Sequence, residues 1–170
     1  MAWRLAAALF ASIIPFAVIL RGVRSGALTD YHIDRREPRR TLLLIALACV
    51  AVGLLGMVAP GAERELLAAL GAGTCGLMVL LTVNRWWKMS VHTGVAAGAV
   101  VVFSQVFGPA VLALAPVVLV VAWSRVRLRD HIPAQAIVGF VLGALTAGLA
   151  FAALRWRVGW AALVPCCTTW

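Results

Sequence analysis

Six long apolar runs follow one another along the chain and constrain its fold more than any other feature. Helices of about 20 apolar residues are long enough to cross the ~30 Å hydrocarbon core of a bilayer. The composition agrees, because 64% of the residues are hydrophobic, 12% are charged and the mean hydropathy is +1.01. We therefore predict an all-α integral membrane protein, a bundle of six transmembrane helices. The expected helices cover residues 4–21, 41–60, 66–84, 92–108, 109–123 and 135–154.

The division into spans leaves two points open. The fourth and fifth runs are separated by Gly108-Pro109 alone, a pair that suits a tight turn between helices. The first run could be a signal peptide, because Arg4 precedes it and small residues follow it, but it is long for one and ends in arginines like a retained span. The longest polar stretch, 22–40, is too short for a core of its own. We expect residues 1–170 to form a single membrane-embedded domain, multi-pass, in a bacterial plasma membrane.

The cysteines and the net charge narrow the possible ligands. Cys49 and Cys75 lie within apolar runs and are expected to be small core residues, and the adjacent Cys166 and Cys167 are not expected to bridge each other. The sequence indicates no metal site and no cofactor. The net charge of +9 would suggest nucleic acid in a soluble protein. Here the arginines cluster at the ends of apolar runs, so membrane lipids or a phosphorylated substrate are the expected partners.

Three polar connections should meet at one face of the membrane. They are 22–40, 85–91 and 124–134, which join helices one and two, three and four, and five and six. Successive spans alternate in direction, so odd-numbered connections emerge on the same side. The other face has four basic residues, Arg4, Arg64, Arg155 and Arg157. The shared face has eleven: Arg21, Arg24, Arg35, Arg36, Arg39, Arg40, Arg85, Lys88, Arg125, Arg127 and Arg129.

Two explanations fit this uneven distribution of charge. Basic residues mark the cytoplasmic side of membrane proteins, and Arg127 and Arg129 suit that role. Alternatively, several guanidinium groups converge on a phosphate, whose oxygens match their fork of donors. The three histidines of the chain, His32, His92 and His131, favour a phosphate site, because one lies in or beside each of the three connections. If five residues are set aside as phosphate ligands, six basic residues remain on the shared face against four on the other face. The five are Arg36, Arg39, Arg85, Lys88 and Arg125. This slight excess points to the cytoplasm as the side on which the shared face lies.

The connections also resemble the signatures of a known family. Ser124-Arg125, five residues and His131 resemble the third signature of the type 2 phosphatidic acid phosphatase superfamily, S-R, five residues, H, three residues, D. Met89-Ser90-Val91-His92, preceded by Lys88, resembles its second signature, P-S-G-H, in degenerate form. The first signature, Lys, six residues, Arg-Pro, has a poor counterpart in Arg36 and Arg39. The order and spacing of the segments and the six helices extend the resemblance over most of the chain.

The resemblance implies metal-independent hydrolysis of a lipid phosphate or diphosphate, such as a polyprenyl or glycosylated polyprenyl phosphate. In the family's terms, His131 would take the phosphoryl group as a phosphohistidine, and His92 would protonate the leaving oxygen. A neutral imidazole is a competent nucleophile near neutral pH, and a covalent intermediate divides one difficult step into two. The resemblance assigns the substrate phosphate to Arg125, Lys88, Ser90 and one or both of Arg36 and Arg39.

One departure from the family concerns the residue that orients the nucleophile. The family's aspartate is replaced by Gln135. Residues four apart share a helix face, so the Gln135 amide oxygen could accept the imidazole N–H of His131, although it supplies no negative charge. The chain could be a slower enzyme, could use a substitute carboxylate, or could be a silent relative that binds or moves an anionic lipid. The substitutes are Asp34, Asp30 and Asp130, the last least favoured because an adjacent helical residue points away. A small transporter ranks below these, because it would need polar residues or broken helices near the middle of the membrane, and the spans show mainly Thr, Ser and Gly there.

Two pairs of glycines predict a close helix contact. Gly94 and Gly98, and Gly139 and Gly143, have the GxxxG spacing that lets helices approach closely in lipid, and each pair follows a motif histidine. We expect the two pairs to pack against each other. His92 and His131 would then lie at neighbouring helix N-termini, where the helix dipoles favour a bound phosphate.

Overall fold

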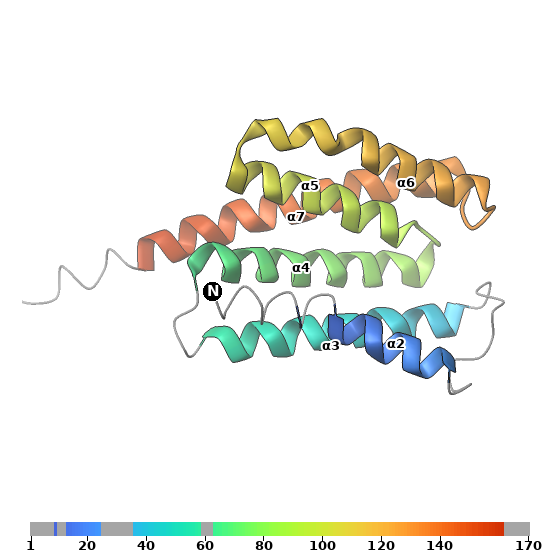
Figure 1. Cartoon of the computed structure of the whole chain (residues 1–170), viewed down its shortest axis with the longest axis horizontal. Helices are drawn as coiled ribbons and strands as arrows, with labels where there is room; N and C mark the ends of the chain where they lie inside the picture. Colours follow the sequence, from blue (N-terminus) through green and yellow to red (C-terminus); the bar gives the residue numbers. More distant parts are fainter. Residues whose placement is uncertain (1–8, 10–12, 25–35, 59–62, 162–170) are drawn as a thin grey trace, which may run out of the picture.

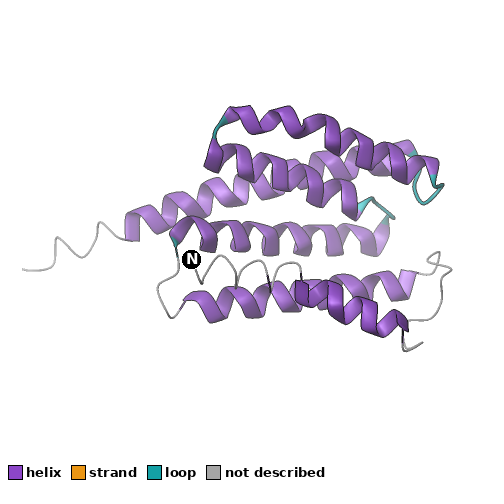
Figure 2. Cartoon of the chain, viewed as in Figure 1, coloured by secondary structure: helices purple, strands orange, loops and turns teal. Residues whose placement is uncertain are grey.

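The structure, a computed structural model, describes residues 9, 13–24, 36–58 and 63–161. Throughout this part of the chain the regular elements are helices (Figure 2). They are α2 (Ile14–Arg24), α3 (Arg36–Val58), α4 (Arg64–Trp86), α5 (Val91–Phe107), the 3-10 helix η2 (Pro109–Leu114), α6 (Ala115–Arg127) and α7 (Pro133–Ala161).

The helices follow the apolar runs of the sequence. Three segments are long and apolar enough to cross a membrane, Arg64–Trp86, Pro109–Arg127 and Pro133–Trp156, and Leu43–Gly56 and Val91–Phe107 are shorter apolar helices. The described part of the protein is therefore helical, with three segments able to span a membrane, and the count of six spans stays a prediction. The expected fifth span is not uniform, because η2 precedes α6 where Pro109 and Pro116 remove backbone donors.

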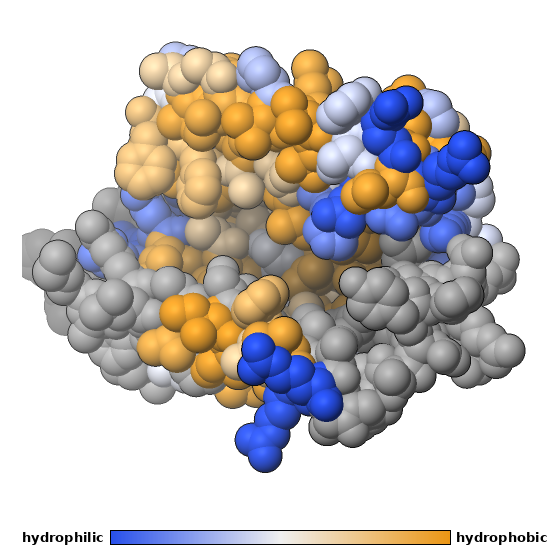
Figure 3. All heavy atoms as spheres, turned by 45° about the vertical axis from the view of Figure 1, so that its right-hand side comes forward, coloured by the Kyte–Doolittle hydropathy of each residue, from blue (hydrophilic) through white to orange (hydrophobic). Residues whose placement is uncertain are grey.

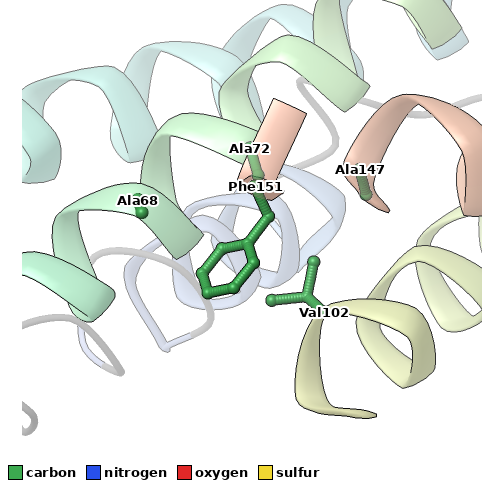
Figure 4. Close-up of a cluster of buried hydrophobic side chains, with 5 residues drawn as sticks. All are labelled: Ala68, Ala72, Val102, Ala147 and Phe151. Carbon is green, nitrogen blue, oxygen red and sulfur yellow. The ribbon is translucent and has the colours of Figure 1, made fainter. Parts of the chain in front are cut away.

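Helix α7 lies at the centre of the bundle. It packs against α4, α5 and α6, while α3 packs on the other side of α4 and α2 on α3 (Figure 1). The fully buried Phe151 of α7 fills the space between α4 and α5, beside Ala68, Ala72 and Val102 (Figure 4). The alanines let the helices approach, and the phenyl ring occupies the remaining volume, which is how interiors reach close packing.

The two GxxxG pairs contact each other, as predicted. A Cβ placed on Gly94 would lie 3.0 Å from the carbonyl oxygen of Gly139, and one on Gly98 would lie 3.0 Å from that of Gly143. A Cβ on Gly143 would overlap the backbone of Gly94 itself. The backbones of α5 and α7 therefore touch, and the absence of side chains at these positions is what permits it.

The two ends of the bundle differ in their polar groups. The α4–α5 and α6–α7 connections lie at one end, together with the last residue of α2 and the first of α3 (Figure 1). We call this the site end; hydrophilic side chains gather there and apolar side chains cover the helix flanks (Figure 3). At the opposite, far end, Arg155 pairs with Glu65 at 3.1 Å and donates to the carbonyl oxygen of Gln105 at 3.1 Å. Gln105 in turn donates to the carbonyl oxygen of Gly148 at 3.2 Å, so α4, α5 and α7 are joined there.

Candidate functional site

The turn from α6 to α7 carries Arg125 and His131 and is closed by backbone hydrogen bonds. Arg129 adopts a left-handed conformation with φ 59°. Its N–H donates to the carbonyl oxygen of Val126 at 3.0 Å, and the Asp130 N–H donates to that of Arg125 at 3.1 Å. This is the Schellman pattern that ends many helices, with arginine where glycine is usual. The His131 N–H also donates to the Arg125 carbonyl oxygen, at 3.3 Å, so the S-R to H spacing corresponds to a closed turn.

His131 is held at the start of α7. It is 5% exposed, and its Nδ1 lies 3.1 Å from Oε1 of Gln135, the hydrogen bond that the sequence predicts. The predicted reason was wrong, because His131 precedes the helix and the two residues do not share a helix face. Helix α7 starts at Pro133, and Gln135 is its third residue. The Gln135 side chain turns back and also accepts the Ile132 N–H at 3.2 Å, half of a capping box.

These two bonds determine the tautomer of His131. A backbone N–H can only donate, so the bond from Ile132 identifies the Gln135 atom beside the imidazole as the amide oxygen. That oxygen accepts, and Nδ1 of the neutral ring therefore carries the proton. The other ring nitrogen, Nε2, keeps its lone pair, which is the state that a nucleophile or a general base requires.

The α4–α5 connection is bonded directly to the start of α7. The Ser90 N–H donates to the carbonyl oxygen of Gln135 at 3.1 Å. The connection is held in shape from the other side by Asn84, whose Oδ1 accepts the Met89 N–H at 3.1 Å. The segments that resemble the second and third family signatures therefore share a hydrogen bond. The GxxxG contact between α5 and α7 begins one helical turn further along both helices.

Ser90 is the N-cap of α5. Its Oγ accepts the Thr93 N–H at 3.5 Å and lies 2.9 Å from Thr93 Oγ1, and both side chains are fully buried. The resemblance assigns this hydroxyl to the substrate phosphate, whereas its position in the structure is that of a helix cap. A serine directly before an apolar run is the ordinary N-cap signal, and it could have identified this role from the sequence. Lys88 is half-buried in the connection, and His92, the second residue of α5, is exposed.

Arg125 lies in the last turn of α6 beside His131. Its Nη1 is 3.4 Å from Oδ2 of Asp130, and its Nε is buried with no hydrogen-bond partner in the described part of the chain. Asp130 lies in the turn and not on a helix, so the reason for ranking it last as a substitute carboxylate does not apply. Its carboxylate lies against Arg125.

The guanidinium of Arg127 lies 5.9 Å from the ring centroid of Trp123, which suits an interfacial role.

The first connection is mostly outside the described residues. Asp30, His32 and Asp34 fall there. Arg36 and Arg39 were expected in a loop, but α3 begins at Arg36, so both lie in its first turn at the site end. Pro38 is tolerated in that turn because the first N–H groups of a helix have no intrahelical partner. The structure does not describe the side chains of these two arginines.

The structure thus brings together Arg125, His131, Gln135 and Ser90 through hydrogen bonds and the packing of α5 on α7. Among the residues that it describes, no three His, Cys, Asp or Glu side chains are grouped to hold a metal ion. No family model, curated protein or solved structure matches the chain.

Proposed function

We propose that this protein is an integral-membrane hydrolase that removes phosphate from a lipid phosphate or diphosphate, with His131 as the nucleophile. The observation that supports this most is the pair of bonds on Gln135, which places the proton of the neutral His131 ring on Nδ1 and makes Nε2 the unprotonated nitrogen. The second support is Arg125, whose buried Nε–H is without a partner among the described residues and lies in the same turn. A nucleophile beside an unused guanidinium donor is an arrangement for phosphoryl transfer.

The proposed reaction has two steps. In the first, Nε2 of His131 attacks phosphorus, the P–N bond forms, and the bond from phosphorus to the lipid oxygen breaks while His92 gives that oxygen a proton. In the second, water gives a proton to His92 and attacks phosphorus, the P–N bond breaks, and inorganic phosphate leaves with both histidines restored. Arg125 and Lys88 would offset the charge on the non-bridging oxygens in both steps.

The surroundings of the site favour a lipid as the substrate. Trp86 and Trp123 are exposed at the site end, and tryptophan is enriched where hydrocarbon meets the head groups. Helix α6 exposes Val117, Leu119 and Val120 along its length. A substrate could keep its tail in the bilayer beside these flanks while its phosphate reaches the turn.

Phosphate release from purified protein tests the proposal. Phosphatidic acid, a polyprenyl phosphate and a polyprenyl diphosphate would be supplied to wild type, His131→Ala and the control Arg127→Ala, which removes a cation from the same helix end. We expect His131→Ala to lose activity by about 10³-fold or more and Arg127→Ala to keep it. Phosphate release that is equal in wild type and His131→Ala would refute the proposal, and lipid binding without release would identify an anionic-lipid binding protein.

His92 is tested by the choice of substrate. A general acid matters most when the leaving oxygen is strongly basic, and a diphosphate leaves more easily than an alcohol. His92→Ala should therefore lose more activity on phosphatidic acid than on the polyprenyl diphosphate, with kcat on each as the measurement. Equal losses would remove His92 from the role of the acid.

A further inference from the structure

Arg125 has a partner that the proposed reaction does not use. The carboxylate of Asp130 lies 3.4 Å from Nη1 of Arg125, in an ion pair whose side chains are 30% and 51% exposed. The Nε–H of Arg125 is buried and is not bonded to any group in the described residues. A guanidinium presents donors on more than one edge, so it can hold a carboxylate at Nη1 and still offer Nε–H to a second anion.

The pair is a consequence of the turn. In a Schellman motif the residue after the left-handed one commonly makes an apolar contact with a residue in the last helical turn. Here these positions are Asp130 and Arg125, and the backbone bond between them is 3.1 Å long. An ion pair replaces the apolar contact. The backbone bond thus holds the two residues close enough for their side chains to pair.

A carboxylate in this place changes how strongly the site binds phosphate. It pairs with Arg125 when no ligand is present, and it repels a phosphate group that binds the same guanidinium. The pair is partly exposed, so the effect on affinity is modest, about 2- to 10-fold by the usual strength of such interactions. Weaker binding of phosphate has a use in a hydrolase, because inorganic phosphate has to leave before the next turnover.

We propose that Asp130 is a built-in counter-ion of Arg125, a positioning residue that lowers the affinity of the site for phosphate and so favours product release. The inference rests on the phosphate site of the proposed function. It concerns binding, and it can be tested without any lipid being hydrolysed.

The test is the affinity of purified protein for inorganic phosphate, measured by calorimetric titration in detergent. Asp130→Asn keeps an oxygen that can accept from Nη1 and removes the charge, so we expect binding to become about 2- to 10-fold tighter. Asp130→Glu restores the charge and should return the dissociation constant to within about 2-fold of the wild-type value. In Arg125→Gln, the further change Asp130→Asn should bring no gain. At 0.5 M salt the gain from Asp130→Asn should shrink, because the pair is partly exposed.

The far end of the bundle offers a matched control. Glu65 also forms a partly exposed ion pair with an arginine, Arg155, and Glu65→Gln changes the net charge by the same amount. We expect Glu65→Gln to leave the affinity for phosphate unchanged. An unchanged or weaker affinity in Asp130→Asn would overturn the inference, as would an equal gain in Glu65→Gln or an absence of phosphate binding in both wild type and Asp130→Asn.

Turnover separates this inference from the proposed function. If lipid phosphate is hydrolysed, Asp130→Asn should lower KM and the inhibition constant of inorganic phosphate without raising kcat. If wild type binds phosphate through Arg125 and Asp130→Asn binds it more tightly, but no lipid is hydrolysed, the proposed function fails and the inference stands. If lipid phosphate is hydrolysed but KM and the inhibition constant are unchanged in Asp130→Asn, the proposed function stands and the inference fails.

Discussion

At the scale of single residues, Gln135 has two tasks that a single atom performs. Its Oε1 caps the start of α7 through the Ile132 N–H and orients His131 through Nδ1. A carboxylate at the same place would do both and would add a negative charge, which stabilises an imidazole that becomes positively charged when phosphorylated. Gln135 therefore gives orientation without electrostatic assistance.

Substitutions at Gln135 distinguish orientation from charge. Gln135→Glu keeps the length and both bonds, so turnover should be preserved or raised. Gln135→Leu loses both bonds, and turnover should fall by a factor that can approach the ~10⁴ seen when a serine protease triad loses its orienting partner. The measurement is kcat on a lipid phosphate, with thermal unfolding as the check on the fold. If Asp30 or Asp34 already supplies the charge, Gln135→Glu should change little and Asp34→Asn or Asp30→Asn should reduce turnover.

Arg129 carries the conformational strain of the α6–α7 turn. Its φ of 59° is unfavourable for a residue with a Cβ, and glycine removes the penalty. Arg129→Gly should therefore stabilise the protein by up to ~1 kcal/mol. Arg127→Gly is the matched control, because Arg127 is the last residue of α6 and has a negative φ, so glycine relieves no strain there and should destabilise by up to roughly 0.5–1 kcal/mol. Denaturant unfolding in detergent would show the two opposite shifts, and a destabilised Arg129→Gly would contradict the account of the turn.

At the scale of helices, the contact between α5 and α7 positions the site. The Ser90 N–H bonds to the Gln135 carbonyl oxygen one turn above the contact between the glycine pairs. Any added atom between these helices separates the backbones and lengthens that bond.

Gly143→Ala tests this contact. Its Cβ would overlap the backbone of Gly94, so we expect a loss of about 3 kcal/mol in stability, together with reduced activity. Gly73→Ala is the control, because a Cβ at Gly73 meets no described atom within 4 Å and should stabilise α4 by about 0.5–1 kcal/mol. Equal effects of the two alanines on the unfolding transition would show that the close approach is not needed.

The helices could be predicted from the sequence better than the connections. Long apolar runs locate helices because hydrocarbon leaves few other ways to satisfy the backbone. The start of α3 at Arg36 was missed, since charged residues in a first turn look like a loop. The left-handed Arg129 and the pair between Arg125 and Asp130 could not be predicted, because arginine gives no turn signal and the pair exists only once the turn is formed. The sequence predicted which side chains bond, those of His131 and Gln135, but not that His131 precedes the helix and that Gln135 turns back to reach it.

At the scale of the whole molecule, the distribution of charge predicts the orientation in the membrane. The excess of basic residues at the site end points to the cytoplasm by the positive-inside rule. Single cysteines at Leu128, exposed at the site end, and at Glu63, exposed at the start of α4 at the far end, would test it in a chain lacking the native cysteines. A membrane-impermeant maleimide added to intact cells should label the cysteine at 63 and not the one at 128. The reverse pattern would place the site outside.

The turn between α5 and η2 has a consequence for the bilayer around the protein. Helix α5 has 17 residues, a length of ~25 Å, whereas α4 has 23 residues, or ~35 Å. The turn after α5 is flanked by apolar residues, so no polar segment lengthens α5 toward the head groups. Lipid beside α5 would have to thin to match its short hydrophobic length, while lipid beside α4 would keep its ordinary thickness. A protein whose hydrophobic length is shorter on one side would collect in the thinner regions of a membrane, since each ångström of mismatch costs a fraction of a kcal/mol.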